Sequence, residues 1–247
     1  MNRIDSGYVR NSFSGGSTLR AYSDAVEGVG LWESERRCCE KYFVREYRLL
    51  DVGCGAGRTT LGLYRLGYVD IEGLDITPAM VDAASHLARE HGIPLRFVVG
   101  DATALPYADA VFEGALFSFN GLMQIPGRDA RVRAMREIGR VLKPGGVFLF
   151  TTHDRTDAEY ADFWAAEKKR WQSGGQDARL HEFGDAIITT EGRETYLHFP
   201  TLSEVSECLE EAGLCLLECV RRSELCEESA AVQAFSTDCV FWAARKP

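Results

Sequence analysis

The sequence predicts an α/β fold in which a doubly wound, mostly parallel, seven-stranded sheet carries helices on both faces. Apolar runs such as YRLLDVG, VDIEGLDI and LRFVVGDA alternate along the chain with segments of helical periodicity. Strands separated by helices of this length form parallel crossover units. The runs GALFSF and VFLFT are apolar almost throughout, which is typical of strands that are covered on both faces.

The elements follow one another in an order that divides the chain into four predicted segments. Residues 1–45 open with SFSGGS and continue with apolar positions that suit amphipathic helices, so they predict an N-terminal helical cap. The other three segments are an α/β core (46–152), an inserted helix with a hairpin (153–200), and a C-terminal helix with the last two strands (201–247).

Start and stop residues support the helices and strands of the core. A helix follows YRLLDVG and ends at Gly67, and the next helix has Thr77 as its N-cap and Pro78 at its first position. The segment VRAMREIGRVLKPGGVFLFTTH predicts a third helix, a Pro-Gly-Gly turn and the fifth strand.

The pattern changes after the fifth strand. DAEYADFWAAEKKRWQSGGQ predicts a charged, aromatic helix, and DAIITTEGRETYLHF predicts two strands around Glu191 and Gly192. TLSEVSECLEEAG then predicts a helix, and LCLLECV and DCVFWAARK predict the last two strands of the sheet.

Composition and charge exclude several classes of protein. With 45% hydrophobic residues the chain can fill a substantial core, and 28 Lys+Arg against 37 Asp+Glu give a net charge of −9. This charge disfavours non-specific binding to nucleic acid. The chain has neither an apolar run of bilayer length nor the pattern of a signal peptide, so we expect a cytoplasmic protein without membrane contact. Eight cysteines and five histidines lack zinc-site spacing, which predicts buried thiols and no protein-built metal site.

The turn after the first predicted strand is rich in glycine. Ligands of open α/β sheets bind at the carboxyl ends of the strands, and a bare backbone at Gly53 and Gly55 lets a ligand approach closely. A dinucleotide fingerprint needs a third glycine where this chain has Arg58, which weakens the hypothesis of an NAD- or FAD-dependent enzyme. A tight turn without a ligand is the plain structural alternative.

Further landmarks follow this turn in order. LLDVGCGAG, GLDIT, GDATALP and LKPGG together resemble the motifs of the class I S-adenosylmethionine-dependent methyltransferases, closely over residues 47–152 and loosely in the final strands. The resemblance implies a Rossmann-like core that binds S-adenosyl-L-methionine and releases S-adenosyl-L-homocysteine. The cofactor-binding residues that it implies, together with the glycine turn, are Asp51, Gly53, Cys54, Gly55, Asp75, Ile76, Met80, Asp101, Ala102, Ser118, Phe119 and Asn120.

The acidic residues of this set have distinct expected roles. Asp75 can accept hydrogen bonds from both ribose hydroxyls, by analogy with the acidic residue of nucleotide-binding folds. The resemblance implies that Asp101 accepts from the adenine amino group and that Asp51 orders the glycine loop near the cofactor's ammonium group. For Asp75 and Asp101 a capping role is the alternative, and Asn120 could equally be a turn former.

The acceptor side of the site lies in segments without motifs. His153 follows the fifth strand at the same rim and is the candidate general base, and a packing or capping role is its alternative. Residues 153–200 are expected to lie over the acceptor site. The residues expected to line the acceptor pocket, for which core packing is an equal alternative, are Tyr22, Trp32, Trp164 and Tyr196.

The leading hypothesis is a methyltransferase that acts on a small molecule, as a monomer or a homodimer. DNA as acceptor is disfavoured because the chain has no NPPY-type tetrapeptide and no Pro-Cys pair. An RNA (tRNA) or protein methyltransferase is the first alternative, and the acidic charge disfavours RNA. A noncatalytic nucleoside-binding module and an NAD-dependent reductase are further alternatives.

Overall fold

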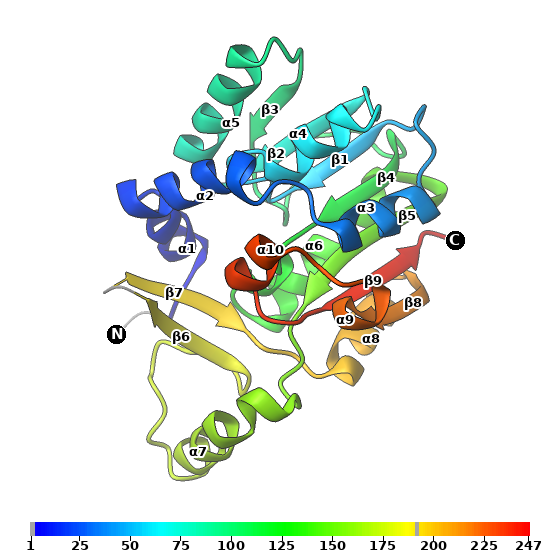
Figure 1. The fold of residues 1–247 in the computed structure, drawn as a ribbon. Helices are drawn as coiled ribbons and strands as arrows, with labels where there is room; N and C mark the ends of the chain where they lie inside the picture. Colours follow the sequence, from blue (N-terminus) through cyan, green and yellow to red (C-terminus); the bar gives the residue numbers. More distant parts are fainter. Residues whose placement is uncertain (1–2, 191–192) are drawn as a thin grey trace.

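The computed structural model describes residues 3–190 and 193–247, and its centre is a seven-stranded sheet in the order β3-β2-β1-β4-β5-β9-β8 (Figure 1). Neighbouring strands are parallel except at β9, which runs antiparallel to both β5 and β8. The predicted seven-stranded, mostly parallel sheet is therefore confirmed. Its strands are β1 (Leu49–Val52), β2 (Ile71–Asp75), β3 (Arg96–Val99), β4 (Phe112–Phe117), β5 (Leu142–Thr152), β8 (Cys215–Arg221) and β9 (Val240–Arg245).

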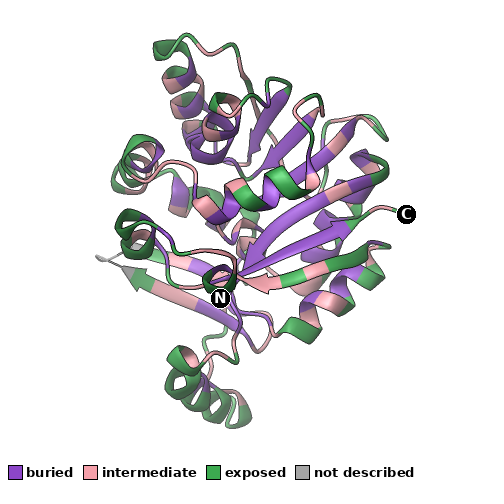
Figure 2. Ribbon diagram, turned by 45° about the vertical axis from the view of Figure 1, so that its right-hand side comes forward, coloured by how far each residue is buried: buried purple, intermediate pink, exposed green. Residues whose placement is uncertain are grey.

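The inner strands form because both of their faces are covered. Every residue of β1 and β2 is buried, and Figure 2 shows the centre of the sheet as buried along its length. Leu50 packs into a core cluster on one face of β1, and Leu49 packs into a second cluster on the other face. This two-sided burial explains why these runs are apolar without alternation.

Helices cover both faces of the sheet, and short helices lie in the connections. The helices are α1 (Ser6–Phe13), α2 (Gly16–Gly28), α3 (Glu33–Tyr42), α4 (Arg58–Arg65), α5 (Pro78–Glu90), η1 (Gly121–Gln124), α6 (Arg128–Val141), η2 (Ala158–Tyr160), α7 (Ala161–Gln172), α8 (Leu202–Glu211), α9 (Arg222–Leu225) and α10 (Ala230–Phe235). Thr77 and Pro78 begin α5 as predicted, although the Thr77 side chain makes no capping bond. The helices α9 and α10, between the last two strands, had no counterpart among the predicted elements.

The Pro-Gly-Gly turn predicted before the fifth strand is incorporated into β5. The strand begins at Leu142, and its pairing with β4 shifts register between Phe112 and Gly114. The Gly145 N–H donates to the Lys246 carbonyl at 3.0 Å, so this glycine segment is held along the edge of the C-terminal strand. The predicted turn thus lies within the bounds of β5, since Gly145 has a φ of 80° and the successive partners of Phe112 and Gly114 are Leu142 and Val147.

The insertion forms a separate hairpin of β6 (Asp185–Thr190) and β7 (Arg193–His198), with α7 beside it. The predicted turn residues, Glu191 and Gly192, lie outside the described residues. The N-terminal helix α1 lies beside this hairpin (Figure 1), where the Tyr8 hydroxyl donates to Glu194 at 2.9 Å. The start of the chain and the insertion therefore meet on the same side of the sheet.

The strand order places a switch point between β1 and β4. The chain runs outward through β2 and β3 on one side of β1, and through β4 and β5 on the other. A crevice opens at the carboxyl ends of strands at such a point. The fold thus brings the ends of β1, β2 and β4 to one edge of the sheet.

Candidate functional site

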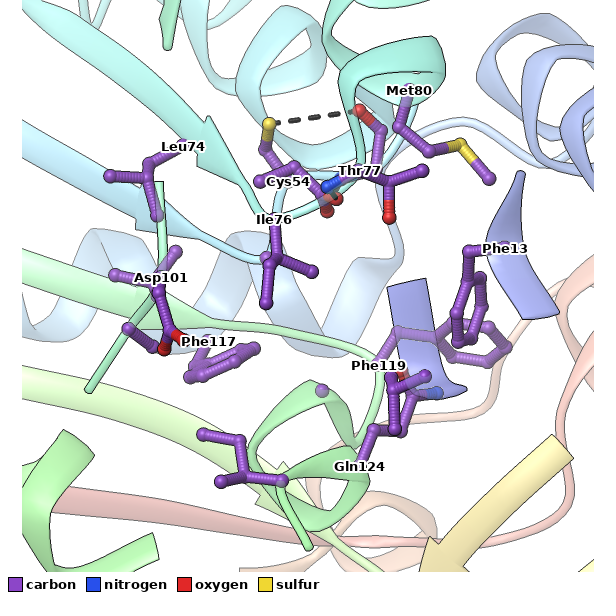
Figure 3. A pocket seen from close by; sticks show the side chains of 18 of the residues that line it. Phe13, Cys54, Leu74, Ile76, Thr77, Met80, Asp101, Phe117, Phe119 and Gln124 are labelled. Carbon is purple, nitrogen blue, oxygen red and sulfur yellow. Dashed lines mark hydrogen bonds between the residues drawn. The ribbon is translucent and has the colours of Figure 1, made fainter. Parts of the chain in front are cut away.

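A cavity of about 360 Å³ lies at these carboxyl ends, within the size range of small-molecule sites. Its floor consists of the strand ends and their loops, and residues 4–25, from α1, α2 and the segment before them, contribute to the opposite side. Figure 3 shows Ile76 between Asp101 and Phe117 on one side and Phe13 and Phe119 on the other. The sequence-predicted cofactor residues that line this cavity are Asp51, Gly53, Cys54, Gly55, Asp75, Ile76, Met80, Asp101, Ala102, Ser118 and Phe119.

Asp75 is fixed at the end of β2 by the backbone of two loops. The Gly55 N–H donates to its Oδ2 at 2.9 Å, and the Thr77 N–H donates to its Oδ1 at 2.8 Å. Burial raises the pKa of this carboxyl, while the two backbone bonds act in the opposite direction. Each carboxylate oxygen has a further lone pair, so Asp75 can accept additional hydrogen bonds from a ligand.

Asp51 is a fully buried carboxyl at the end of β1. The Thr60 hydroxyl donates to its Oδ2 at 2.6 Å. Burial raises its pKa to about 7, and the nearby carboxylate of Glu35 contributes in the same direction. An ionised Asp51 would gain from a positively charged group in the cavity, since a buried charge is stable only when it is paired.

Asp101 lines the cavity and also closes its own turn. Its Oδ1 accepts from the backbone N–H of Thr103 at 2.8 Å and from the Thr103 hydroxyl at 2.7 Å. The capping role considered from the sequence is therefore present. It leaves Oδ2 for other donors.

The glycine turn has a backbone that other residues rarely adopt. Gly53, Gly55 and Gly57 all have positive φ, at 64°, 54° and 92°. A Cβ on Gly53 would lie 2.3 Å from the Phe117 ring, and one on Gly55 would lie 3.2 Å from the Tyr22 ring. A side chain at either position would therefore meet an aromatic ring of the protein, while both glycines line the cavity with their backbone.

Comparison with known proteins identifies a methyltransferase domain in this part of the chain. Residues 49–146 match a family model described as a methyltransferase domain. Methyltransferase GfsG of Streptomyces halstedii is 32% identical over 123 residues, which are 47% of this chain and 43% of that protein. A malonyl-[acyl-carrier protein] O-methyltransferase of Erwinia pyrifoliae is 29% identical over 213 residues, or 80% of this chain and 73% of that protein. The chain thus spans less than half of the length of GfsG.

Solved structures share the fold over most of the chain. A SAM-dependent methyltransferase from Methanosarcina mazei aligns with a TM-score of 0.69 and 21% identity, covering 88% of this chain and 98% of that one. The [4+2]-cyclase SpnF aligns with a TM-score of 0.70 and 22% identity, covering 100% of this chain and 98% of that one. Residues 49–146 thus carry a methyltransferase domain, and the fold of the chain is that of S-adenosylmethionine-dependent methyltransferases.

The cofactor of this family is S-adenosylmethionine, and the cavity of the methyltransferase domain fits it. Three carboxylates, from Asp51, Asp75 and Asp101, line the cavity, which suits a ligand with positive charge and hydroxyl donors. Arg58 also lines it, but Glu35 already pairs with this guanidinium at 2.5 Å. Ile76 and Met80 supply apolar surface between these polar groups.

His153 does not line the cavity of the methyltransferase domain, which removes the basis for its expected role as a base. Its Nδ1 donates to the Asp238 carbonyl at 3.2 Å, so Nε2 accepts from the Asn120 side-chain amide at 3.0 Å. Burial lowers the pKa of His153, which favours the neutral ring that this arrangement needs. Asn120 also lies behind the cavity, where the Thr151 hydroxyl accepts from its backbone N–H.

The hydrogen-bonded pair of Asn120 and His153 supports a turn of unusual backbone conformation. Phe119 and Asn120 have φ angles of 51° and 58°, although neither is glycine. The Phe119 ring lines the cavity, so the hydrogen bond from Asn120 to His153 holds a cavity wall in place. His153 is thus a structural support of the site.

Replacing His153 with alanine should lower the free energy of unfolding by about 1–3 kcal/mol, because the buried Asn120 amide loses its acceptor. Urea denaturation of both proteins measures the change. His86→Ala is the matched control, since His86 is exposed on α5 and should change stability by less than about 0.5 kcal/mol. Equal effects of the two substitutions would contradict the supporting role.

Three of the four aromatic residues predicted to line the acceptor pocket lie elsewhere. Tyr22 does line the cavity. Trp32 is buried against the Phe119 ring and the Arg58 guanidinium, because its apolar surface completes the packing under α3. Tyr196 is buried and donates to Asp185, so the hairpin interior holds it.

Trp164 and its helix α7 also lie away from the cavity. Its ring packs against Phe183 and Phe199 in a small cluster within the insertion. Among the described residues of the insertion, His181 is the one that lines the cavity. The expected cover over the site therefore comes from the N-terminal helices rather than from α7.

A group of potential metal ligands lies beside the cavity rather than in it. One ligand atom each from Glu182, Asp185 and His198 lies within 4.8 Å of the others, an association that no sequence spacing revealed. Arg131 donates to Glu182 at 2.6 Å, and the His198 ring donates to Asp185 at 2.8 Å. The first bond links the segment before the hairpin to α6, and the second joins the two strands of the hairpin. Within the described residues, no helix is long and apolar enough to span a membrane.

Proposed function

We propose that this chain transfers a methyl group from S-adenosylmethionine to a small-molecule acceptor. The observation that supports the proposal most strongly is the convergence of Asp51, Asp75 and Asp101 on one cavity at the switch point of the sheet. The bound cofactor supplies a methyl group that is already activated by a positively charged sulfur. Little acid–base chemistry is then needed, and the protein chiefly holds the two reactants in line.

The floor of the cavity supplies the residues that would hold the cofactor. Asp75, held by two backbone N–H groups, would accept from the ribose hydroxyls. Asp51 would pair with the ammonium group, and Asp101 would accept from the adenine amino group. Ile76 and Met80 would pack against the purine ring. These are the roles that the sequence motifs predicted.

The other side of the cavity favours a small acceptor over a macromolecule. Residues of α1 and α2 line it together with the glycine turn, so the space left is a chamber rather than an extended groove. The net charge of −9 also disfavours an RNA acceptor.

Calorimetric titration with S-adenosylmethionine and, separately, with NAD tests this proposal. We expect binding of the former only, and a loss of affinity of at least tenfold in Asp75→Ala, because a charge-assisted pair of hydrogen bonds disappears. Asp82→Ala is the matched control, since Asp82 is exposed on α5. Binding of NAD alone, or unchanged affinity in Asp75→Ala, would overturn the proposal.

A further inference from the structure

Beyond the cofactor-binding floor, the cavity has an aromatic wall formed by Phe13, Tyr22, Phe119 and Phe235. The Phe13 and Tyr22 rings meet edge to face at 5.7 Å, and Tyr22 meets Phe119 in the same way at 6.0 Å. Phe119 and Phe235 are stacked at 4.8 Å. Four separate parts of the chain thus contribute one continuous run of rings, which is a surface suited to a planar apolar ligand.

His181 lines the same cavity, and one of its two ring nitrogens already makes a hydrogen bond within the protein. Its Nε2 lies 2.6 Å from the Ile4 carbonyl, and a carbonyl oxygen only accepts, so Nε2 carries the proton. In the neutral ring Nδ1 therefore has the lone pair. Within residues 3–190 and 193–247, the structure gives Nδ1 no hydrogen-bond partner.

The backbone around His181 holds the ring in this orientation. Its N–H donates to Asp185 at 2.8 Å, and Asp185 is itself fixed by Tyr196 and His198. The ring also lies close to Gly127, where a Cβ would be 3.4 Å from Nδ1. Such an imidazole, held by a backbone carbonyl through one nitrogen, is arranged as a base oriented by a third group.

The other polar side chains on this side of the cavity are poorer proton acceptors. Asp5 is exposed, and its carboxylate accepts from the Tyr8 N–H as the N-cap of α1. Gln124 has an amide, which is not basic, and Arg133 has only donors. His153 lies outside the cavity. His181 is therefore the group best suited to take a proton there.

We propose that the methyl acceptor is a small planar compound with an acidic hydroxyl, a phenol in chemical class, and that His181 is its general base. This proposal rests on the proposed function. The acceptor's ring lies along the aromatic wall, and its O–H proton passes to Nδ1 of His181. The oxygen then forms the bond to the methyl carbon, while the carbon–sulfur bond breaks and its electron pair remains on sulfur.

The test uses the full chain saturated with S-adenosylhomocysteine and titrated with 4-nitrophenol, whose visible absorbance reports the phenolate. We expect binding, with a larger phenolate fraction than in free solution at the same pH. In His181→Phe the affinity should fall at least tenfold and the phenolate signal should disappear. His181→Gln should keep part of the affinity but not the signal. Cyclohexanol, which has neither a planar ring nor an acidic hydroxyl, should bind at least tenfold more weakly.

The controls separate this inference from the proposed function. Affinity for S-adenosylhomocysteine, measured first for every variant, should be unchanged by His181→Phe, His181→Gln and the surface control His86→Gln. If the wild-type chain does not bind S-adenosylhomocysteine, the proposed function fails. If it does, then absent binding of 4-nitrophenol, an unchanged signal in His181→Phe, or equal binding of cyclohexanol overturns the inference.

Discussion

Replacing Glu35 with glutamine is expected to lower the free energy of unfolding by about 3–5 kcal/mol, because it leaves the buried Arg58 guanidinium without its counter-charge. The two nitrogens of Arg58 donate to the two oxygens of Glu35 at 2.6 and 2.5 Å. Glutamine keeps an oxygen for the backbone N–H of Trp32, which donates to Glu35 at 2.9 Å in the wild type. The change in stability therefore reports the lost charge together with the loss of one of the two Arg58 hydrogen bonds, because the glutamine NH2 only donates.

Chemical denaturation measures this effect, and the same helix offers a matched control. Glu33 pairs with Arg36 and Arg37 on the surface of α3, so Glu33→Gln should cost less than about 1 kcal/mol. A double variant, Glu35→Leu with Arg58→Met, should recover most of the loss, since a buried pair can be exchanged for apolar residues. Similar losses of stability in Glu35→Gln and Glu33→Gln would contradict the larger effect expected for the buried pair.

Replacing Asp51 with asparagine is expected to stabilise the ligand-free protein at pH 8 while it weakens cofactor binding. The folded protein holds a proton on Asp51 up to about pH 7, whereas the unfolded chain releases it near pH 4. The stabilising contribution is therefore complete below about pH 4 and is lost as the pH rises through 7. The difference amounts to about 4 kcal/mol.

Urea denaturation at pH 5 and pH 8 tests this linkage. The wild type should lose stability between the two values relative to Asp51→Asn, whose side chain does not titrate and can still accept from Thr60. Calorimetry at pH 8 should show S-adenosylmethionine binding about 10–100-fold more weakly to Asp51→Asn, because the charged partner of its ammonium is gone. Asp82→Asn should alter neither quantity. Parallel pH profiles of wild type and Asp51→Asn would refute the raised pKa.

The sequence was most informative where a function needs local backbone geometry. The alternation of apolar runs and helices predicted the sheet, and the motifs that end β1 and β2 located Gly53, Gly55 and Asp75 at one edge. These features are visible in sequence because turn glycines and strand ends lie next to one another in the chain. The side of the cavity opposite the floor has no such signature, since Phe13, His181 and Phe235 meet only through tertiary packing.

The residues whose positions were predicted incorrectly show the same limit of sequence analysis. His153 lies at the correct rim, but its side chain points to Asn120 and the Asp238 carbonyl, which no local pattern encodes. Trp32 and Tyr196 occupy the apolar interior, where large aromatic side chains gain most from burial. His181 had a weak signal at best, because a single histidine in an irregular segment is not distinctive.

The antiparallel strand β9 has a consequence for how the molecule is made. It lies between β5 and β8 and pairs with both, so β8 reaches the rest of the sheet only through a strand that is synthesised after it. In the sheet β9 lies between β5 and β8, whereas in the chain it follows both and is therefore synthesised last. Until Val240–Arg245 is in place, one edge of β5 lacks its strand partner and β8 cannot join the sheet, and an unpaired strand edge favours aggregation.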